Sequence, residues 1–118
     1  MGYLTYHILD TTKGIAAADV TIRLFQHTND EQRLLIHTDL SNEDGRCNSP
    51  LLEGEAFKAG VYELEFDIDD YFTKQGIKPS EPSFLNTVVI RFGISDEGAH
   101  YHIPLLVSPY SYSTYRGS

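Results

Sequence analysis

Five histidines are the side chains of this 118-residue chain best suited to proton transfer near neutral pH, because imidazole titrates there. His100 and His102 stand two residues apart, so on a β-strand they share one face. Such a pair can also ligate a metal, but a zinc site needs more ligands than two. We therefore expect no metal and no cofactor. The plain alternative, in which these histidines and His7 are ordinary surface residues, stays open at this point.

The end of the sequence combines several reactive groups in the run Tyr110-Ser-Tyr-Ser-Thr-Tyr-Arg-Gly-Ser118. Chain ends usually fray and tolerate change. Here Tyr115, Arg116 and Ser118 offer an aromatic ring, a guanidinium, a hydroxyl and a terminal carboxylate. We expect this end to belong to a site, so that residues added after Ser118 impair activity.

The elements that must position these residues are mostly strands, since apolar and polar residues alternate with period two. The expected strands cover residues 4–9, 20–25, 33–38, 61–66, 87–94, 100–107 and 110–115. Acidic residues at 69–70 and Gly76 predict one short helix over residues 69–76. Short strands with frequent turn signals indicate an all-β protein, an antiparallel β-sandwich formed by one domain, residues 1–118.

The alternation also predicts which way the histidines face. In residues 101–107 the odd-numbered positions are all apolar, which predicts a core face, so His102 points outward with Pro104 and Leu106. In the first strand Leu4, Tyr6 and Ile8 share one face and His7 lies on the other. An outward face that mixes His, Tyr, Ser and Leu is typical of an interface or a site.

Composition excludes several classes of partner. The net charge is −8, which argues against nucleic acid and against anionic membranes. The single cysteine, Cys47, rules out an intrachain disulfide. We see no signal peptide and no apolar run long enough to span a membrane, so we expect a cytoplasmic protein.

Three segments together resemble one family. Leu4-Thr-Tyr-His-Ile-Leu-Asp-Thr11, Asp44-Gly-Arg-Cys47 and the run from His100 to the Tyr-Arg-Gly-Ser ending closely resemble the 5-hydroxyisourate hydrolases, the transthyretin-like enzymes of urate catabolism. The resemblance covers the whole chain. Tyr6 departs from it, because the family often has Thr there.

The resemblance implies a transthyretin-like sandwich of two four-stranded sheets, assembled as a homotetramer (a dimer of dimers) with sites in the channel between dimers. It implies a small-molecule substrate, 5-hydroxyisourate, and the product 2-oxo-4-hydroxy-4-carboxy-5-ureidoimidazoline. Carried over by motif, the site residues are His7, Arg46, His102, Tyr115, Arg116 and Ser118.

The reaction so implied adds water to a ring carbonyl. A neutral His7 or His102 serves as the base, and Arg46 stabilises the developing oxyanion. Tyr115 and Arg116 bind the ring, and Ser118 orients the water or a histidine through its hydroxyl or its carboxylate. Two other classes remain: a transthyretin-like carrier of a small aromatic ligand, and a structural interaction module.

Overall fold

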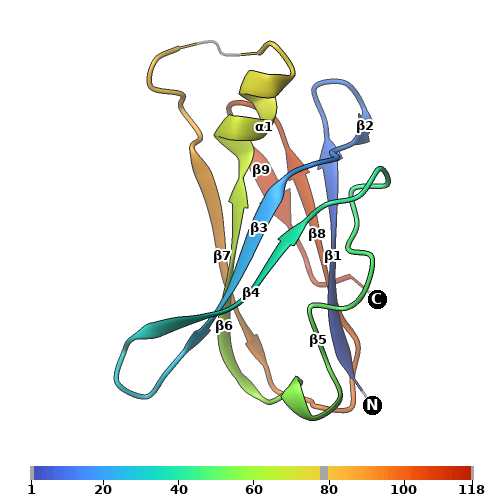
Figure 1. Cartoon of the computed structure of the whole chain (residues 1–118), viewed down its shortest axis with the longest axis vertical. Coiled ribbons are helices and arrows are strands. Elements are labelled where there is room, and N and C mark those ends of the chain that lie inside the picture. The colour runs from blue at the N-terminus through green and yellow to red at the C-terminus, as the bar shows by residue number, and fades with distance from the viewer. Residues whose placement is uncertain (1, 78–79, 118) are drawn as a thin grey trace.

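Two β-sheets packed face to face make up the computed structural model, which describes residues 2–77 and 80–117 (Figure 1). The first sheet has the order β2-β1-β8-β9, and β5 pairs with the free end of β1. The second has the order β4-β3-β6-β7. The first sheet consists of β1 (Tyr3–Asp10), β2 (Ile15–Ala16), β5 (Leu52–Glu53), β8 (Tyr101–Val107) and β9 (Tyr112–Thr114). The second consists of β3 (Thr21–His27), β4 (Arg33–Leu40), β6 (Gly60–Asp67) and β7 (Thr87–Ile94).

The predicted sandwich is confirmed, with two differences in detail. The first sheet gains β5, a two-residue strand that pairs with Tyr3 and Leu4. One pair, β1 with β8, is parallel rather than antiparallel. Parallel neighbours need a long connection between them, and here the whole second sheet lies between β1 and β8 in the sequence. This parallel pair carries His7 and His102 of the candidate site.

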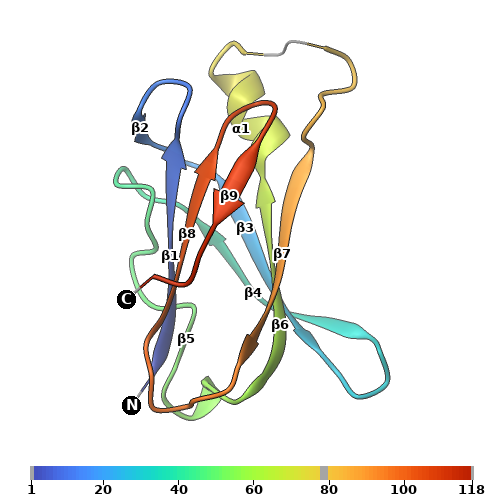
Figure 2. The same cartoon turned by 180° about the vertical axis from the view of Figure 1, so that it is seen from behind.

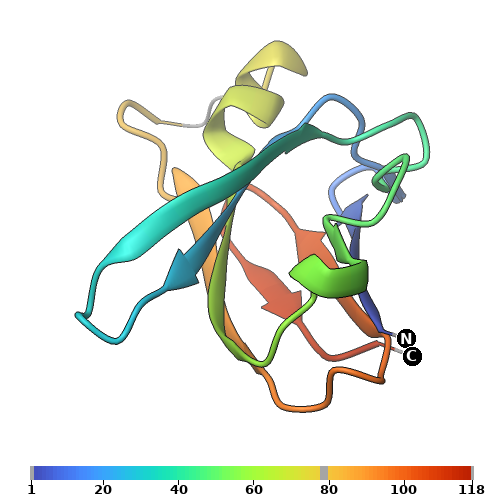
Figure 3. The ribbon, with the colours of Figure 1, turned by 60° about the horizontal axis from the view of Figure 1, so that its bottom comes forward.

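The core lies between the two sheets, which Figure 3 shows as separate layers. The predicted alternation is confirmed: Leu4, Tyr6 and Ile8 of β1 are fully buried, while His7 between them is half-buried on the other face. Each fully buried apolar side chain contributes about 1.5–3 kcal/mol to folding. The Tyr6 hydroxyl reaches through the core and donates a hydrogen bond of 2.6 Å to Asp39. Packing on one face of β1 thereby fixes the direction of the other face.

One short helix, α1 (Ile68–Lys74), follows β6 directly and caps one end of the sandwich (Figure 1). It buries Ile68, Tyr71 and Phe72, and acidic residues stand in its first turn, where the helix dipole favours them. Gly76 with φ of 77° turns the chain away after the last turn. The predicted helix over residues 69–76 is therefore confirmed with its end two residues earlier. A single turn of 3₁₀-helix, Gly54–Ala56, was not predicted.

The last strand is shorter than predicted. Residues 110 and 111 belong to a turn, because the Ser108 amide donates to the Ser111 carbonyl and the Ser108 hydroxyl contacts the Tyr110 and Ser111 amides. Regular pairing with β8 covers only Tyr112–Thr114. Beyond it, Gly117 returns to β8 through a single bridge to His102. In the part of the chain that the structure describes, no helix is long and apolar enough to cross a membrane.

Candidate active site

His7 and His102 lie on neighbouring strands and on the same outward face of the first sheet. His7 is opposite Pro104 in the parallel register, so the two histidines are offset by two residues along the strands. Their ring centroids are 6.5 Å apart and the rings are nearly parallel. Such a pair can assist the attack of water on a carbonyl group, because both rings can exchange protons near neutral pH.

Arg46 is brought to the same place by a tight turn. Asn42 accepts hydrogen bonds from the amides of Asp44 and Arg46, and Gly45 adopts a φ of 72°. A side chain at Gly45 would lie 2.4 Å from the carbonyl oxygen of Ile8, so only glycine permits this close approach to β1. The backbone of Arg46 then pairs with that of His7. The predicted trio of His7, Arg46 and His102 is therefore adjacent in the structure.

A cavity of about 290 Å³ opens beside His100 and His102, and His7 is not among the described residues that line it. Its walls combine imidazoles, one guanidinium, a hydroxyl and two phenol rings, a mixture suited to a small polar ring compound. The residues that line it are Tyr3, Thr5, Tyr6, Arg46, Cys47, His100 and His102.

The surroundings favour neutral imidazoles at both positions. Burial lowers the pKa of His102 below its ordinary value, and the positive charge of Arg46 together with His100 and His7 lowers it further. Burial and Arg46 also lower the pKa of His7, although an opposing contribution comes from Asp44. A neutral imidazole is the form that accepts a proton from water. The arrangement can therefore supply a base and, in Arg46, a donor to a developing oxyanion.

The sequence pattern gave no role in the reaction to Thr5, His100 or Tyr3, and the structure links them to His102. Thr5 Oγ1 lies 2.8 Å from His102 Nδ1 and 2.9 Å from His100 Nε2. The ring of Tyr3 stacks on that of His100 at 3.9 Å between centroids. The alternation placed Thr5 on the face of His7, but only the parallel register of β1 and β8 shows that Thr5 stands opposite His102.

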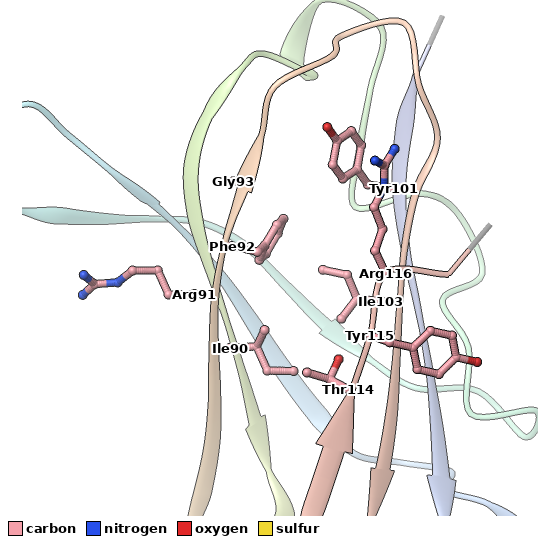
Figure 4. Close-up of a pocket in the computed structure, with 9 residues that line it drawn as sticks. All are labelled: Ile90, Arg91, Phe92, Gly93, Tyr101, Ile103, Thr114, Tyr115 and Arg116. Carbon is pink, nitrogen blue, oxygen red and sulfur yellow. The ribbon is translucent and has the colours of Figure 1, made fainter.

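The predicted residues of the chain end are placed differently from the histidines. The Arg116 guanidinium stacks over the Tyr101 ring at 4.0 Å, at the open edge between the sheets. Figure 4 shows Arg116 reaching toward Tyr101 while Tyr115 points away from it, and both line a second cavity of about 260 Å³. The structure does not bring Arg116 together with the histidines. Ser118 lies outside the described residues.

Gly117 is the residue of the chain end that pairs with His102. Figure 2 shows the chain turning after β9 back across β8 toward β1. Its amide donates to the His102 carbonyl at 2.7 Å. A Cβ at this position would lie 2.8 Å from His102 Cδ2, so glycine lets the segment pass close to the imidazole.

The cavity also contains the single cysteine. Cys47 is half-buried, and burial raises the pKa of its thiol, which keeps it protonated near neutral pH. In residues 2–77 and 80–117 no three His, Cys, Asp or Glu side chains are grouped so that they could hold a metal ion.

Comparison with known proteins places this chain in a family. Residues 4–117 match the family described as HIUase/Transthyretin. The 5-hydroxyisourate hydrolase of Ralstonia nicotianae is 55% identical over 118 residues, which is the full length of both chains.

Solved structures agree. The crystal structure of (S)-allantoin synthase matches with a TM-score of 0.94 and 44% identity, over 99% of this chain, which spans 44% of that longer one. Sea bream transthyretin in complex with thyroxine matches with a TM-score of 0.88 and 36% identity, over 97% of this chain and 93% of that one. The chain therefore belongs to the HIUase/transthyretin family.

Proposed function

We propose that this protein hydrolyses 5-hydroxyisourate to 2-oxo-4-hydroxy-4-carboxy-5-ureidoimidazoline, at the cavity beside His7, Arg46 and His102. The observation that carries the proposal is the pair of imidazoles, both with lowered pKa, beside one guanidinium on the outward face of β1 and β8. Support for the substrate comes from the hydrolase of Ralstonia nicotianae, whose sequence matches this chain from end to end.

The chemistry needs one base, one oxyanion donor and one acid. A neutral histidine takes a proton from water as the water oxygen attacks a ring carbonyl carbon. Arg46 stabilises the negative charge that develops on the carbonyl oxygen. The bond between that carbon and the ring nitrogen then breaks, and the nitrogen accepts the proton from the imidazolium. His7 and His102 are both placed to be the base. No metal or cofactor takes part, so we expect that treatment with EDTA leaves the rate unchanged.

The proposal gives binding roles to the chain end. Tyr115 and Arg116 hold the substrate ring, and Ser118 orients the water or a histidine. The side chain of Tyr115 is exposed, and Gly117 beside it reaches His102, which supports a role of this segment near the imidazole. Arg116 has to leave its stack on Tyr101 to join the histidines from the same chain.

A homotetramer, a dimer of dimers with the sites in the channel between the dimers, is part of the proposal. The exposed rings of Tyr112 and Tyr115, in and just after β9, support it, since exposed aromatic side chains are typical of interfaces. The mass in sedimentation should be four times the 13.3 kDa of one chain. A mass of one chain at micromolar concentration would contradict this assembly. We also keep the cytoplasmic location predicted from the sequence.

A carrier of a small aromatic ligand is the second candidate, favoured by the match to sea bream transthyretin in complex with thyroxine. A carrier binds its ligand without converting it. Its ligand would have to displace water from a cavity lined mainly by polar and titratable groups, which suits apolar rings less well than a polar substrate.

The experiment that separates the two candidates generates 5-hydroxyisourate with urate oxidase and follows its ultraviolet decay with and without this protein. The spontaneous decay is the baseline. We expect a rate that rises in proportion to the protein concentration. Decay at the spontaneous rate, together with saturable binding of thyroxine, would favour the carrier.

A further inference from the structure

Thr5 stands between two histidines of the site. Its hydroxyl is within hydrogen-bond distance of His102 Nδ1 and His100 Nε2, and the proposed reaction does not use this hydroxyl. We propose that Thr5 and His100 are positioning residues for His102: they keep its proton on Nδ1, so that Nε2 presents a lone pair to the reacting water. The inference rests on the proposed function, because it deepens the role of one residue of that site.

The Thr5 hydroxyl has a single proton to share between two histidines. A threonine hydroxyl donates one hydrogen bond and can accept others. If the hydroxyl donates to His102 Nδ1, then His102 carries its proton on Nε2 and cannot act there as a base. If the hydroxyl donates to His100 Nε2, then His102 Nδ1–H donates to Thr5, and Nε2 of His102 keeps its lone pair. The chain of donors from His102 to Thr5 to His100 therefore sets the tautomer of His102.

The charges around His102 favour the second arrangement. The groups that act on it are Arg46 from the loop, His7 from β1 and His100 just before β8, each a cation or potential cation that disfavours an added proton. Among the described residues, none has a hydrogen bond to His102 Nε2. Beside the Arg46 cation, a lone pair at Nε2 is more favourable than an N–H at that atom.

The far end of the chain of hydrogen bonds is held in place. Tyr3 stacks on His100 at 3.9 Å with an angle of 23° between the rings. Thr5 is branched at Cβ, which restricts its rotamers on a strand, and the parallel register fixes it opposite His102. Both partners of the hydroxyl thus have defined positions before a substrate arrives, which is what a positioning role requires.

The proton balance of the reaction is complete with these groups. Water gives its proton to His102 Nε2, and the imidazolium then has N–H groups at both nitrogens. The Nδ1–H keeps its hydrogen bond to Thr5 throughout. The proton on Nε2 leaves to the ring nitrogen of the opened substrate, which restores the starting tautomer. In this scheme His102 is the base, and Thr5 and His100 never exchange a proton with the substrate.

The first arm of the test is spectroscopic and needs no turnover. Nitrogen-15 chemical shifts of the His102 ring distinguish a protonated from an unprotonated ring nitrogen. We expect Nδ1 protonated and Nε2 unprotonated at neutral pH in the wild-type protein, and a mixture of tautomers in Thr5→Val. A wild-type ring protonated on Nε2, or an unchanged tautomer in Thr5→Val, would overturn the inference even if the protein is a hydrolase.

The second arm is kinetic. We expect Thr5→Val to lower kcat about 10–100-fold with little change in KM, as the loss of an orienting partner does. Thr5→Ser, which keeps the hydroxyl, should recover most of the rate, and His100→Phe, which keeps the stack on Tyr3, should show a smaller loss. Thr21→Val on β3 makes the same change in the other sheet and should leave kcat unaffected. An equal loss in Thr5→Ser and Thr5→Val would assign the effect to packing and overturn the role of the hydroxyl.

The two proposals fail in different ways. If the wild-type protein does not accelerate the decay of 5-hydroxyisourate, the proposed function falls, while the ring nitrogen shifts still decide the tautomer. If the wild-type protein is active and Thr5→Val keeps its kcat, only the positioning role falls.

Discussion

The histidines on the outward faces of the two sheets have opposite kinds of charged neighbour. On the second sheet, His27 contacts the Glu63 carboxylate at 3.0 Å. We call this the charged face: the guanidinium groups of Arg23, Arg33 and Arg91 form ion pairs with Glu63, Glu65 and Asp67, and His27 forms a hydrogen bond with Glu63. On the first sheet lies the histidine face, made by His7, Arg46, His100 and His102.

The difference lies in the partner of the imidazole. On the charged face each cation meets a carboxylate, so charges neutralise one another and the face adds to stability. On the histidine face the main charged neighbour is the Arg46 cation, which disfavours protonation of His7 and His102. A face that keeps its imidazoles neutral forgoes ion pairs, which is typical of a functional site rather than of a stabilising surface. Equivalent substitutions on the two faces should therefore have different effects on the reaction.

A large effect is expected from the arginine of the histidine face. Lysine lacks the planar fork of arginine, so Arg46→Lys should lower kcat/KM about 10²–10³-fold, as expected for loss of an oxyanion donor. Arg33→Lys, the same change on the charged face, should leave kcat/KM within about twofold. Decay of 5-hydroxyisourate measured at several substrate concentrations checks both. Equal losses in the two variants would remove the distinction between the faces.

The pH dependence of the rate gives the next effect. The ordinary pKa of histidine is about 6.5 and those of His7 and His102 are lowered by burial and Arg46, so both are neutral near pH 7. We expect kcat/KM to stay level down to about pH 6.5 and then to fall, by up to about tenfold per pH unit, as the base is protonated. In Arg46→Gln the remaining activity should begin to fall at a higher pH. A flat profile between pH 5 and 8 would argue against a histidine base.

The smallest effect on the reaction is expected on the charged face, where the change concerns stability. The Glu63 side chain is only 7% exposed and accepts hydrogen bonds from His27 and Arg33. Glu63→Gln should therefore reduce the free energy of unfolding by about 1–3 kcal/mol and leave kcat within about twofold. Urea unfolding at fixed protein concentration measures the change, with the exposed Glu55→Gln as the matched control. A lowered kcat with unchanged stability would contradict the structural role of the ladder.

At low pH the charged face loses stability, because the Glu63 carboxylate becomes protonated. Burial raises the pKa of Glu63, but hydrogen bonds from His27 and Arg33 outweigh it and the net pKa is lowered from 4.5. A carboxylate whose pKa is lowered by folding stabilises the fold above its unfolded pKa and loses that contribution as the pH falls through the folded value. The gap in stability between wild type and Glu63→Gln should therefore narrow below about pH 4.5.

The sequence was sufficient where the physics is local. Alternation of apolar and polar residues is a property of one strand, so it placed Leu4, Tyr6 and Ile8 in the core and His7 outside it. It also predicted β7 (Thr87–Ile94) with the bounds that the structure has.

Sequence patterns could not predict contacts between distant parts of the chain. Thr5 and His102 are 97 residues apart in sequence, and their hydrogen bond depends on the parallel pairing of β1 and β8, which no local pattern encodes. The stack of Arg116 on Tyr101 depends instead on the antiparallel pairing of β9 with β8, and the alternation pattern did not show it either. The shortening of β9 arises from the hydroxyl of Ser108, which competes with strand pairing by bonding to the backbone of its own turn.

The most direct test compares two variants, His102→Asn and His27→Asn. The rate of 5-hydroxyisourate decay is measured with each variant at equal protein concentration near neutral pH. Each variant loses one imidazole, and circular dichroism confirms that both are folded. We expect His27→Asn to stay within about threefold of wild type and His102→Asn to lose a factor of about 10²–10⁴, the contribution of a general base. Equal rates for the two variants would contradict the assignment of the reaction to the histidine face.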